Sequence, residues 1–318
     1  MTNRNTNLIG ITSAVGAGVF FTINDTVIKF LSDGYALHQI VLIRSTIGMA
    51  ITLGVLMPLM GGYTHLRTTR LKAHMLRGFF VVFANMTFFL GLSAMRIADA
   101  TAIFFFAPLL ITGFSVIFLG ETVGPRRWIA VALGLAGVII IMRPGSASFQ
   151  PAALLPLAAA FGYAGLHILT RRIGSTESAL TMAFYIQATF IVVSAIFGLV
   201  FGSGQFSDAS SASLDFLTRA WGTPARSDYA LLVAVGTASA IGGYLISQAY
   251  RLCEAGLAAP FEYIAMPLSI FWGVVVFDEW PDSTTWAGIT LILTAGLYTA
   301  WRETAKDSWL AGRKPKRQ

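Results

Sequence analysis

The apolar segment PLLITGFSVIFLGE, at residues 108–121, begins with a proline, ends in a glutamate and is followed by a second apolar run at residues 128–142. The same plan recurs near the C-terminus, where an apolar run containing Pro267 ends in Asp278 and Glu279 and precedes another apolar run. The proline lies 13 residues before the glutamate in the first copy and 12 residues before it in the second. A helical hairpin repeated at the end of each half of a chain is typical of an internal duplication, which in membrane proteins usually indicates a transporter.

The composition is that of a membrane protein. Hydrophobic residues make up 55% and charged residues 12% of the 318 residues, and the mean hydropathy is +0.69. Soluble domains carry about 25% charged residues. The formal charge of +7 is what basic residues gathered on one side of a membrane would produce, and no nucleic-acid partner is expected. The single cysteine, Cys253, excludes an intramolecular disulfide and a cysteine-based metal cluster.

Apolar runs of about 20 residues predict membrane-spanning helices, because a hydrocarbon core about 30 Å thick requires that length at about 1.5 Å per residue. Ten such runs predict an all-α integral membrane protein with ten transmembrane helices. They lie at residues 8–31, 37–60, 75–94, 99–120, 127–143, 151–171, 178–201, 229–251, 257–277 and 284–301. The segment between residues 202 and 226 is polar and too short to form a separate domain.

The distribution of lysine and arginine predicts that both termini are cytoplasmic. With that orientation, 16 basic residues lie in inner segments and 4 in outer segments, as the positive-inside rule requires. The outer residues are Arg96, Arg143, Arg219 and Arg226. Because each half holds an odd number of helices, the second half is expected to be inverted relative to the first. We therefore expect two five-helix repeats, at residues 1–145 and 146–302, and a basic cytoplasmic tail at residues 303–318.

These features resemble EamA-type members of the drug/metabolite transporter superfamily. The resemblance rests on the inverted repeat, on the hairpin ending LGE in one copy and DE in the other, and on GLAGVIIIMRPG at residues 134–145. It implies a multi-pass secondary transporter of the bacterial inner membrane that works by alternating access, with a central cavity lined by helices 1, 3, 4, 6, 8 and 9. Gln187 on helix 7 would then lie away from the cavity. The second hairpin has DEW where GE is usual, which we expect to affect the helix end more than transport.

An ATP-driven pump and an enzyme are both disfavoured by what the sequence lacks. No lysine follows a glycine, so the phosphate-binding loop of a nucleotide hydrolase cannot occur. The four histidines, His38, His65, His74 and His167, have no metal-ligand spacing, and we expect no catalytic residues, no cofactor and no metal.

A channel subunit and a non-transporting membrane receptor form the alternative class of function. A channel would show rings of like charge, and a receptor would need a larger soluble surface than this chain has. The expected partners are a small-molecule substrate and membrane lipid, while a monomer and a homodimer both remain open.

Charged and strongly polar residues at membrane depth are the candidates for substrate binding, because each is costly unless it is paired or faces water. Asp25 lies about 9 Å inside one end of helix 1, and Arg44 lies about 12 Å inside the neighbouring end of helix 2. A structural ion pair between them and a gating or substrate-contact role both remain open. Lys29, one helical turn after Asp25, is expected to extend its amine to the membrane surface.

A second polar set lies near the opposite ends of three predicted helices. Glu262, His167 and Gln248 are expected to meet there as a proton relay, an anchor for a polar ligand or a structural cluster. Aromatic residues are expected to form the cavity wall, although at most half can face it because successive helical residues diverge by about 100°. The full set of substrate-binding candidates is Asn24, Asp25, Arg44, Asn85, Phe105, Tyr163, His167, Tyr244, Gln248, Glu262, Tyr263 and Trp272.

The stretches TINDTVIKFLS, HQIVLIRS and ADATAIFFFAP, beginning at residues 22, 38 and 98, resemble a subset of these transporters that includes riboflavin importers and S-adenosylmethionine carriers. Riboflavin uptake is the leading hypothesis, because a broad uncharged ring suits an aromatic slot with partners such as Asn24, Asn85, Tyr244 and Gln248. A cationic sulfonium substrate would instead need an acidic cavity, which Asp25 and Glu262 would supply. Export of amino acids or drugs is a further alternative.

Overall fold

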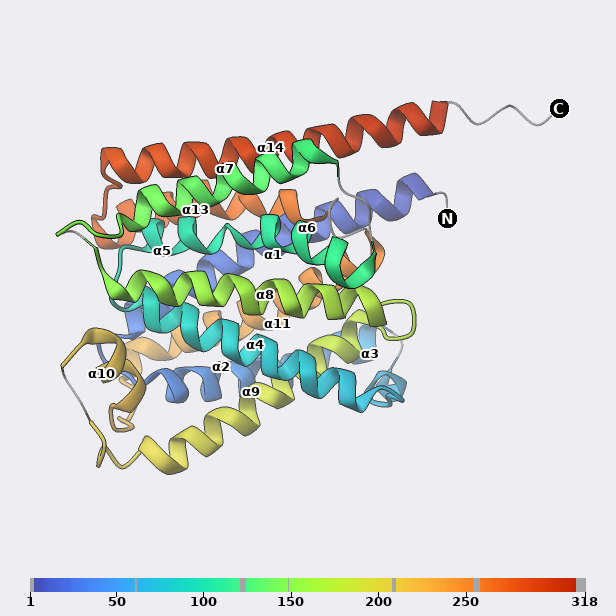
Figure 1. Ribbon diagram of the computed structural model, residues 1–318. Coiled ribbons are helices and arrows are strands. Elements are labelled where there is room, and N and C mark those ends of the chain that lie inside the picture. The colour runs from blue at the N-terminus through green and yellow to red at the C-terminus, as the bar shows by residue number, and fades with distance from the viewer. Residues whose placement is uncertain are drawn as a thin grey trace.

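The computed structural model describes residues 3–60, 62–120, 124–147, 149–207, 210–253 and 258–312. Glu121, with which the first hairpin copy ends, and the last six residues of the basic tail lie outside the described residues. The described chain is helical throughout, without strands. Its helices run lengthwise, so that most connections lie at one of two ends of the bundle (Figure 1). We call the end that carries both termini the terminal end and the opposite one the loop end.

The long helices match the predicted apolar runs closely. They are α1 (Asn3–Leu31), α2 (Leu37–Ile51), α4 (Leu71–Leu92), α7 (Pro125–Met142), α8 (Leu154–Ile173), α9 (Ala179–Phe201), α11 (Tyr229–Leu252) and α14 (Ser283–Gly312). Helix α2 continues through a π-helical turn, Thr52–Leu56, into α3 (Met57–Leu59). Within the described ranges, seven helical segments are long and apolar enough to cross a membrane, and 128–142 and 261–277 form shorter apolar helices.

Two predicted runs are interrupted instead of continuous. The run at residues 99–120 divides into α5 (Ile97–Phe104) and α6 (Ala107–Leu119), because Pro108 has no N–H and its ring would clash with the carbonyl of Phe104. The run at residues 257–277 divides into a 3₁₀ helix, η5 (Ala259–Ile264), and α13 (Ala265–Phe277), next to Pro267. Each copy of the repeated segment therefore contains a broken helix, which is where transporters commonly build their binding sites.

The repeated helices end in the same conformation although their sequences differ there. Gly120 after α6 has φ 70° and ψ 21°, and Asp278 after α13 has φ 54° and ψ 32°, so both residues are left-handed. Aspartate is one of the few residues besides glycine that adopts this conformation, because its short polar side chain can hydrogen-bond locally. The replacement of glycine by aspartate in the second copy therefore does not change how the helix ends.

The two hairpins point in opposite directions. Helix α6 ends and α7 begins at the terminal end, whereas α13 ends and α14 begins at the loop end (Figure 1). Helices α7 and α14 pack along each other through Gly137 and Gly288. A Cβ added to Gly137 would lie 2.9 Å from the Gly288 carbonyl oxygen, and one added to Gly288 would lie 2.8 Å from the Gly137 oxygen. Side chains at either position would force these two helices apart.

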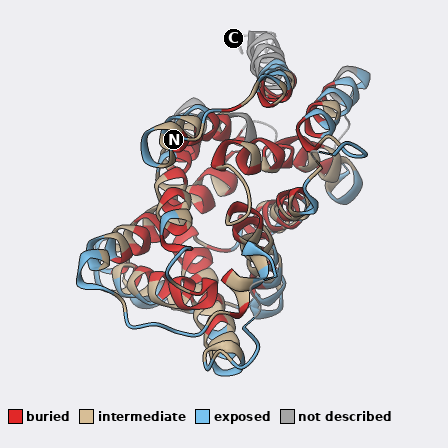
Figure 2. Cartoon of the chain, turned by 90° about the vertical axis from the view of Figure 1, so that its left-hand side faces the viewer, coloured by how far each residue is buried: buried red, intermediate tan, exposed pale blue. Residues whose placement is uncertain are grey.

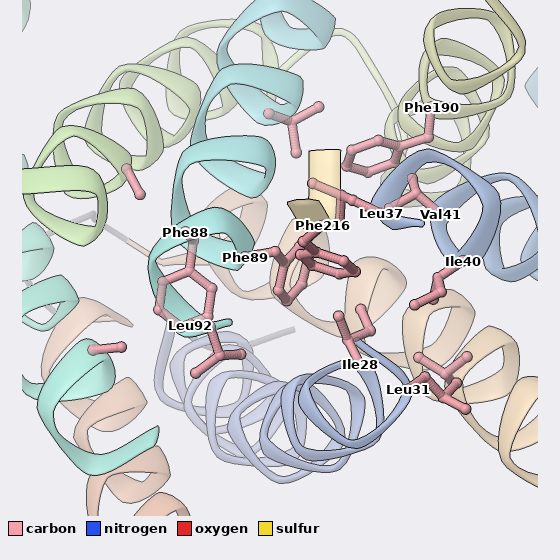
Figure 3. Close-up of a cluster of buried hydrophobic side chains, with 14 of the residues drawn as sticks. Ile28, Leu31, Leu37, Ile40, Val41, Phe88, Phe89, Leu92, Phe190 and Phe216 are labelled. Atoms are coloured by element: carbon pink, nitrogen blue, oxygen red, sulfur yellow. The ribbon is translucent and has the colours of Figure 1, made fainter. Parts of the chain in front are cut away.

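The buried residues lie on the faces that the helices turn toward one another, and the exposed residues form an outer rim (Figure 2). One core cluster joins α1, α2, α4 and α9 near the loop end, where Phe89 packs beside Ile28 and Phe216 (Figure 3). Phe216 belongs to the short helix α10 (Ala212–Thr218) and is only 1% exposed. The segment between α9 and α11 therefore packs onto the bundle through Phe216.

Candidate functional site

A central cavity that opens outward lies between the two halves of the bundle. Its wall is formed by α1, α2, α4, α5, α8, α9, α11 and the η5–α13 break. The resemblance had implied only six of these segments, and α2 and α9 contribute as well. Gln187 of α9 lines the cavity and donates a hydrogen bond of 3.3 Å to Ser239, so the expectation that it lies away from the cavity was wrong.

Most of the predicted site residues meet at this cavity. Those that line it are Asn24, Asp25, Arg44, Asn85, Phe105, Tyr163, His167 and Glu262. Tyr244 and Gln248, both half-buried, lie outside the lining. Tyr263 is buried behind the wall and donates a 3.4 Å hydrogen bond to the Phe105 carbonyl oxygen. Trp272 lies in a separate apolar groove with Phe30 and Val276.

The polar group nearer the loop end is organised around Arg44, which is 2% exposed. Its guanidinium donates to the side-chain oxygens of Asn24, at 3.3 Å, and Asn85, at 3.2 Å. Asn24 donates in turn to a carboxylate oxygen of Asp25, at 3.0 Å. The predicted pairing of Asp25 with Arg44 is thus indirect, because the Asn24 amide stands between them.

Two aromatic rings contact the same guanidinium. The Arg44 Cζ lies 4.9 Å from the ring centre of Phe190 and 5.6 Å from that of Phe89. Cation–π attraction compensates part of the cost of burying this charge, and it leaves the fork of N–H groups directed at the amides. The sequence offered no signal for Phe190, which was one of many aromatic residues in an apolar helix.

The polar group nearer the terminal end is organised around Glu262 at the broken helix. The Tyr163 hydroxyl donates to Oε2 at 2.5 Å, and the Tyr250 hydroxyl donates to Oε1. The His167 ring lies between them, with its centre 4.1 Å from that of Tyr163 and 3.9 Å from that of Tyr250. Glu262 and His167 therefore meet through two tyrosines, and the predicted third member, Gln248, does not line the cavity.

Tyr250 was missed by the sequence analysis. Ser239, Gly243 and Ile246 of α11 line the cavity, and Tyr250 follows Ile246 by four residues on the same helical face. That spacing could have pointed to it. Because every face of this helix is apolar, however, the sequence alone did not show which face turns inward.

An ion pair joins the two halves at the loop end. The Lys29 Nζ lies 2.7 Å from Glu279 Oε1 and donates to the Met95 carbonyl oxygen at 2.7 Å, while the Ile97 N–H donates to Glu279 Oε2 at 3.0 Å. The Lys29 side chain is only 11% exposed. The expectation that Lys29 extends to the membrane surface was therefore wrong, since its amine is satisfied inside the protein.

A second set of charges reinforces this junction. Arg96 pairs with Asp99 at 2.7 Å and with Asp282 at 3.2 Å, and Arg143 pairs with Asp282 at 2.6 Å. Although partial burial raises the pKa of Asp282, hydrogen bonds from Thr285 and from both guanidinium groups outweigh it and hold that pKa well below its ordinary value. Two of these ion pairs, Arg96–Asp282 and Arg143–Asp282, thus link residues of the first half to the second half at the loop end.

Comparisons with known proteins agree with this architecture. The model of the EamA-like transporter family matches residues 8–143 and again residues 150–300. An S-adenosylmethionine uptake transporter of Rickettsia bellii is 27% identical, over 92% of this chain and 95% of its own. A riboflavin transporter of Vibrio cholerae is 28% identical over 92% of each chain, and a pseudopaline exporter of Pseudomonas aeruginosa is 26% identical over 90% and 94%.

One solved crystal structure superposes with a TM-score of 0.66 over 93% of this chain and 97% of the other. The two sequences are 20% identical, so this likeness concerns the fold alone.

Proposed function

Because the chain belongs to the EamA-like transporter family of the drug/metabolite transporter superfamily, we propose that its central cavity carries a small organic metabolite across the bacterial inner membrane by alternating access. It is a multi-pass membrane transporter and not an enzyme. We propose ten spanning helices, arranged as inverted repeats at residues 1–145 and 146–302, with the tail at residues 303–318 in the cytoplasm. The opposed hairpins and the double family match support this arrangement.

The proposed substrate is S-adenosylmethionine or a close analogue, and the observation that carries this choice is the charge of the cavity. Asp25 and Glu262 line it together with Arg44, so both signs of charge are available. S-adenosylmethionine carries a sulfonium, an ammonium and a carboxylate beside its adenine ring, so Asp25 would attract its cationic groups and Arg44 its carboxylate. Phe88, Phe104 and other rings on the wall can stack on the adenine and attract the sulfonium.

Riboflavin is the second candidate, favoured by the aromatic wall. Its flat ring would fit between phenylalanines. Four polar partners were expected for it. The side-chain oxygens of Asn24 and Asn85 already accept hydrogen bonds from Arg44, however, and Tyr244 and Gln248 are not in the cavity lining. An uncharged substrate would also leave the buried charges of the cavity without a ligand partner, which makes it the weaker fit.

Proteoliposomes containing the full chain would test the substrate. We expect them to exchange labelled S-adenosylmethionine in counterflow and not labelled riboflavin. Asp25→Asn should lower this exchange by about tenfold or more, the effect of losing about 1.4 kcal/mol of binding. Asp33→Asn, which removes an exposed carboxylate outside the cavity, should not. Exchange of riboflavin alone would favour the second candidate, and exchange of neither would refute both substrates.

Topology gives a separate prediction. In a Cys253→Ala background, a cysteine in place of the exposed Ser210 should react with an impermeant maleimide in intact cells, and one in place of the exposed Thr69 should react only after permeabilisation. Cys253 is fully buried, so its removal should leave the labelling background unchanged. Labelling of Ser210→Cys only from the cytoplasmic side would contradict the proposed cytoplasmic termini.

A further inference from the structure

The Glu262 carboxylate is buried at membrane depth with two uncharged partners. It is 6% exposed, it lines the cavity, and its described hydrogen-bond donors are the hydroxyls of Tyr163 and Tyr250. An ionised carboxylate inside a membrane protein is costly without a cation beside it. Two hydroxyl donors can stabilise the ionised form when the cavity holds water, but they do not neutralise it. The neutral, protonated form is the one that can be sealed away from water.

A second buried polar side chain without an assigned role, His167, lies beside Glu262. It is 2% exposed, and neither ring nitrogen has a hydrogen-bond partner among the described residues. Buried polar atoms are seldom left unpaired without a functional reason. Imidazole can accept a proton at one nitrogen and donate one from the other, and this ring contacts both tyrosines that hold Glu262. The His167 ring therefore lies on the route by which a proton would pass between the water in the cavity and the Glu262 carboxylate.

We propose that Glu262 is a proton-binding site through which proton movement is coupled to transport. The carboxylate takes up one proton from water when the cavity opens to one side of the membrane and returns it to water when the cavity opens to the other. Only an O–H bond forms and breaks in each cycle. The loaded carrier reorients with Glu262 neutral, because an ionised carboxylate resists removal from water. The coupling role rests on the proposed transport function, whereas the binding site itself does not.

Other charged and titratable groups act on this site from the elements packed around it. Asp25 of α1 adds negative charge near Tyr163, and Arg77 of α4 adds positive charge near His167. Tyr263 follows Glu262 within η5 and is buried in an apolar cluster to which α6 and α14 contribute Leu109 and Ile292. Among the described residues, the hydrogen-bond partners of Glu262 itself are therefore both uncharged.

Infrared difference spectroscopy of the full chain in lipid vesicles would test the site without any substrate. Between alkaline and acidic buffer, a carbonyl stretching band of a protonated buried carboxyl should appear and should be lost in Glu262→Gln. Glu177→Gln is the matched control, since Glu177 is also 6% exposed but bonds to Thr68 and His74 outside the cavity. Tyr250→Phe should move the transition to higher pH, because one donor to the ionised form is lost. A band unchanged in Glu262→Gln would overturn the proposal.

Measurements of substrate transport then test whether proton movement at Glu262 is coupled to it. An inward acid gradient of one pH unit supplies about 1.4 kcal/mol per proton and should drive about tenfold accumulation of labelled S-adenosylmethionine. Glu262→Gln should lose this accumulation, and the counterflow exchange that remains should no longer depend on pH, whereas Glu177→Gln should keep both the accumulation and the pH dependence of exchange. Gradient-driven accumulation by Glu262→Gln would refute the coupling. If the wild type exchanges no tested solute, the proposed function fails, and the infrared result still decides whether Glu262 binds the proton.

Discussion

Replacing Arg44 with glutamine is expected to abolish transport. The guanidinium is the only described group that joins Asn24 of α1, Asn85 of α4 and the Phe190 ring of α9. Its loss leaves Asp25, which is half-buried and linked to Arg44 through Asn24, without a compensating cation, and breaking a buried pair in this way costs about 3–5 kcal/mol. That corresponds to a loss of more than about a hundredfold. Accumulation of labelled substrate, normalised to the amount of folded protein, measures the effect.

Arg44→Lys separates charge from geometry. A lysine keeps the charge but lacks the planar fork whose two terminal nitrogens separately reach Asn24 and Asn85, so most of the activity should also be lost. Arg226→Gln, at an exposed position, should behave as wild type.

A double-mutant cycle of Asp25→Asn with Arg44→Gln should show that the double variant is less impaired than the two single effects added together. Additivity within about 0.5 kcal/mol would contradict coupling of Asp25 to Arg44 through Asn24.

Reversing one charge of the Lys29–Glu279 pair is the second change that we expect to reduce transport strongly. Lys29→Glu would place two carboxylates at a junction where the original atoms lie 2.7 Å apart and the side chains are 11% and 23% exposed. Because the pair joins the two halves at the loop end, the contact between the halves there should lose about 1–3 kcal/mol of coupling energy. Substrate accumulation should fall about tenfold or more, and the temperature of unfolding should drop.

Exchanging the two charges provides the test. The variant with both Lys29→Glu and Glu279→Lys should recover part of the activity, but not all, because the original lysine also bonds to Met95 and the original glutamate to Ile97. Asp215→Asn, which removes an ion pair to Arg219 within the segment between α9 and α11, should leave transport unchanged. A charge exchange no more active than Lys29→Glu would show that the ion pair does not hold the two halves together.

The positions of the helices were predictable because the membrane sets their length and apolar character. The run predicted at residues 178–201 is α9 (Ala179–Phe201), for example. The rotation of each helix was not predictable, because a membrane helix is apolar on every face. Gly243 lines the cavity, so Tyr244, about 100° further round α11, turns away from it. The sequence therefore predicted that the cavity wall is rich in aromatic residues, but it identified only some of the residues that form it.

The sequence by itself determined a membrane-embedded helical chain with a repeated hairpin, and it singled out Asp25, Arg44, His167 and Glu262, because polar groups at membrane depth are too costly to lack a purpose. Only the tertiary structure decided their partners. Lys29 and Glu279 are separated by 250 positions in the sequence, and Tyr250 of α11 donates its hydrogen bond to Glu262 of the following element, η5. Apolar length is a local property of the chain, whereas a hydrogen bond requires two side chains to meet in space, and that depends on how the helices rotate and pack.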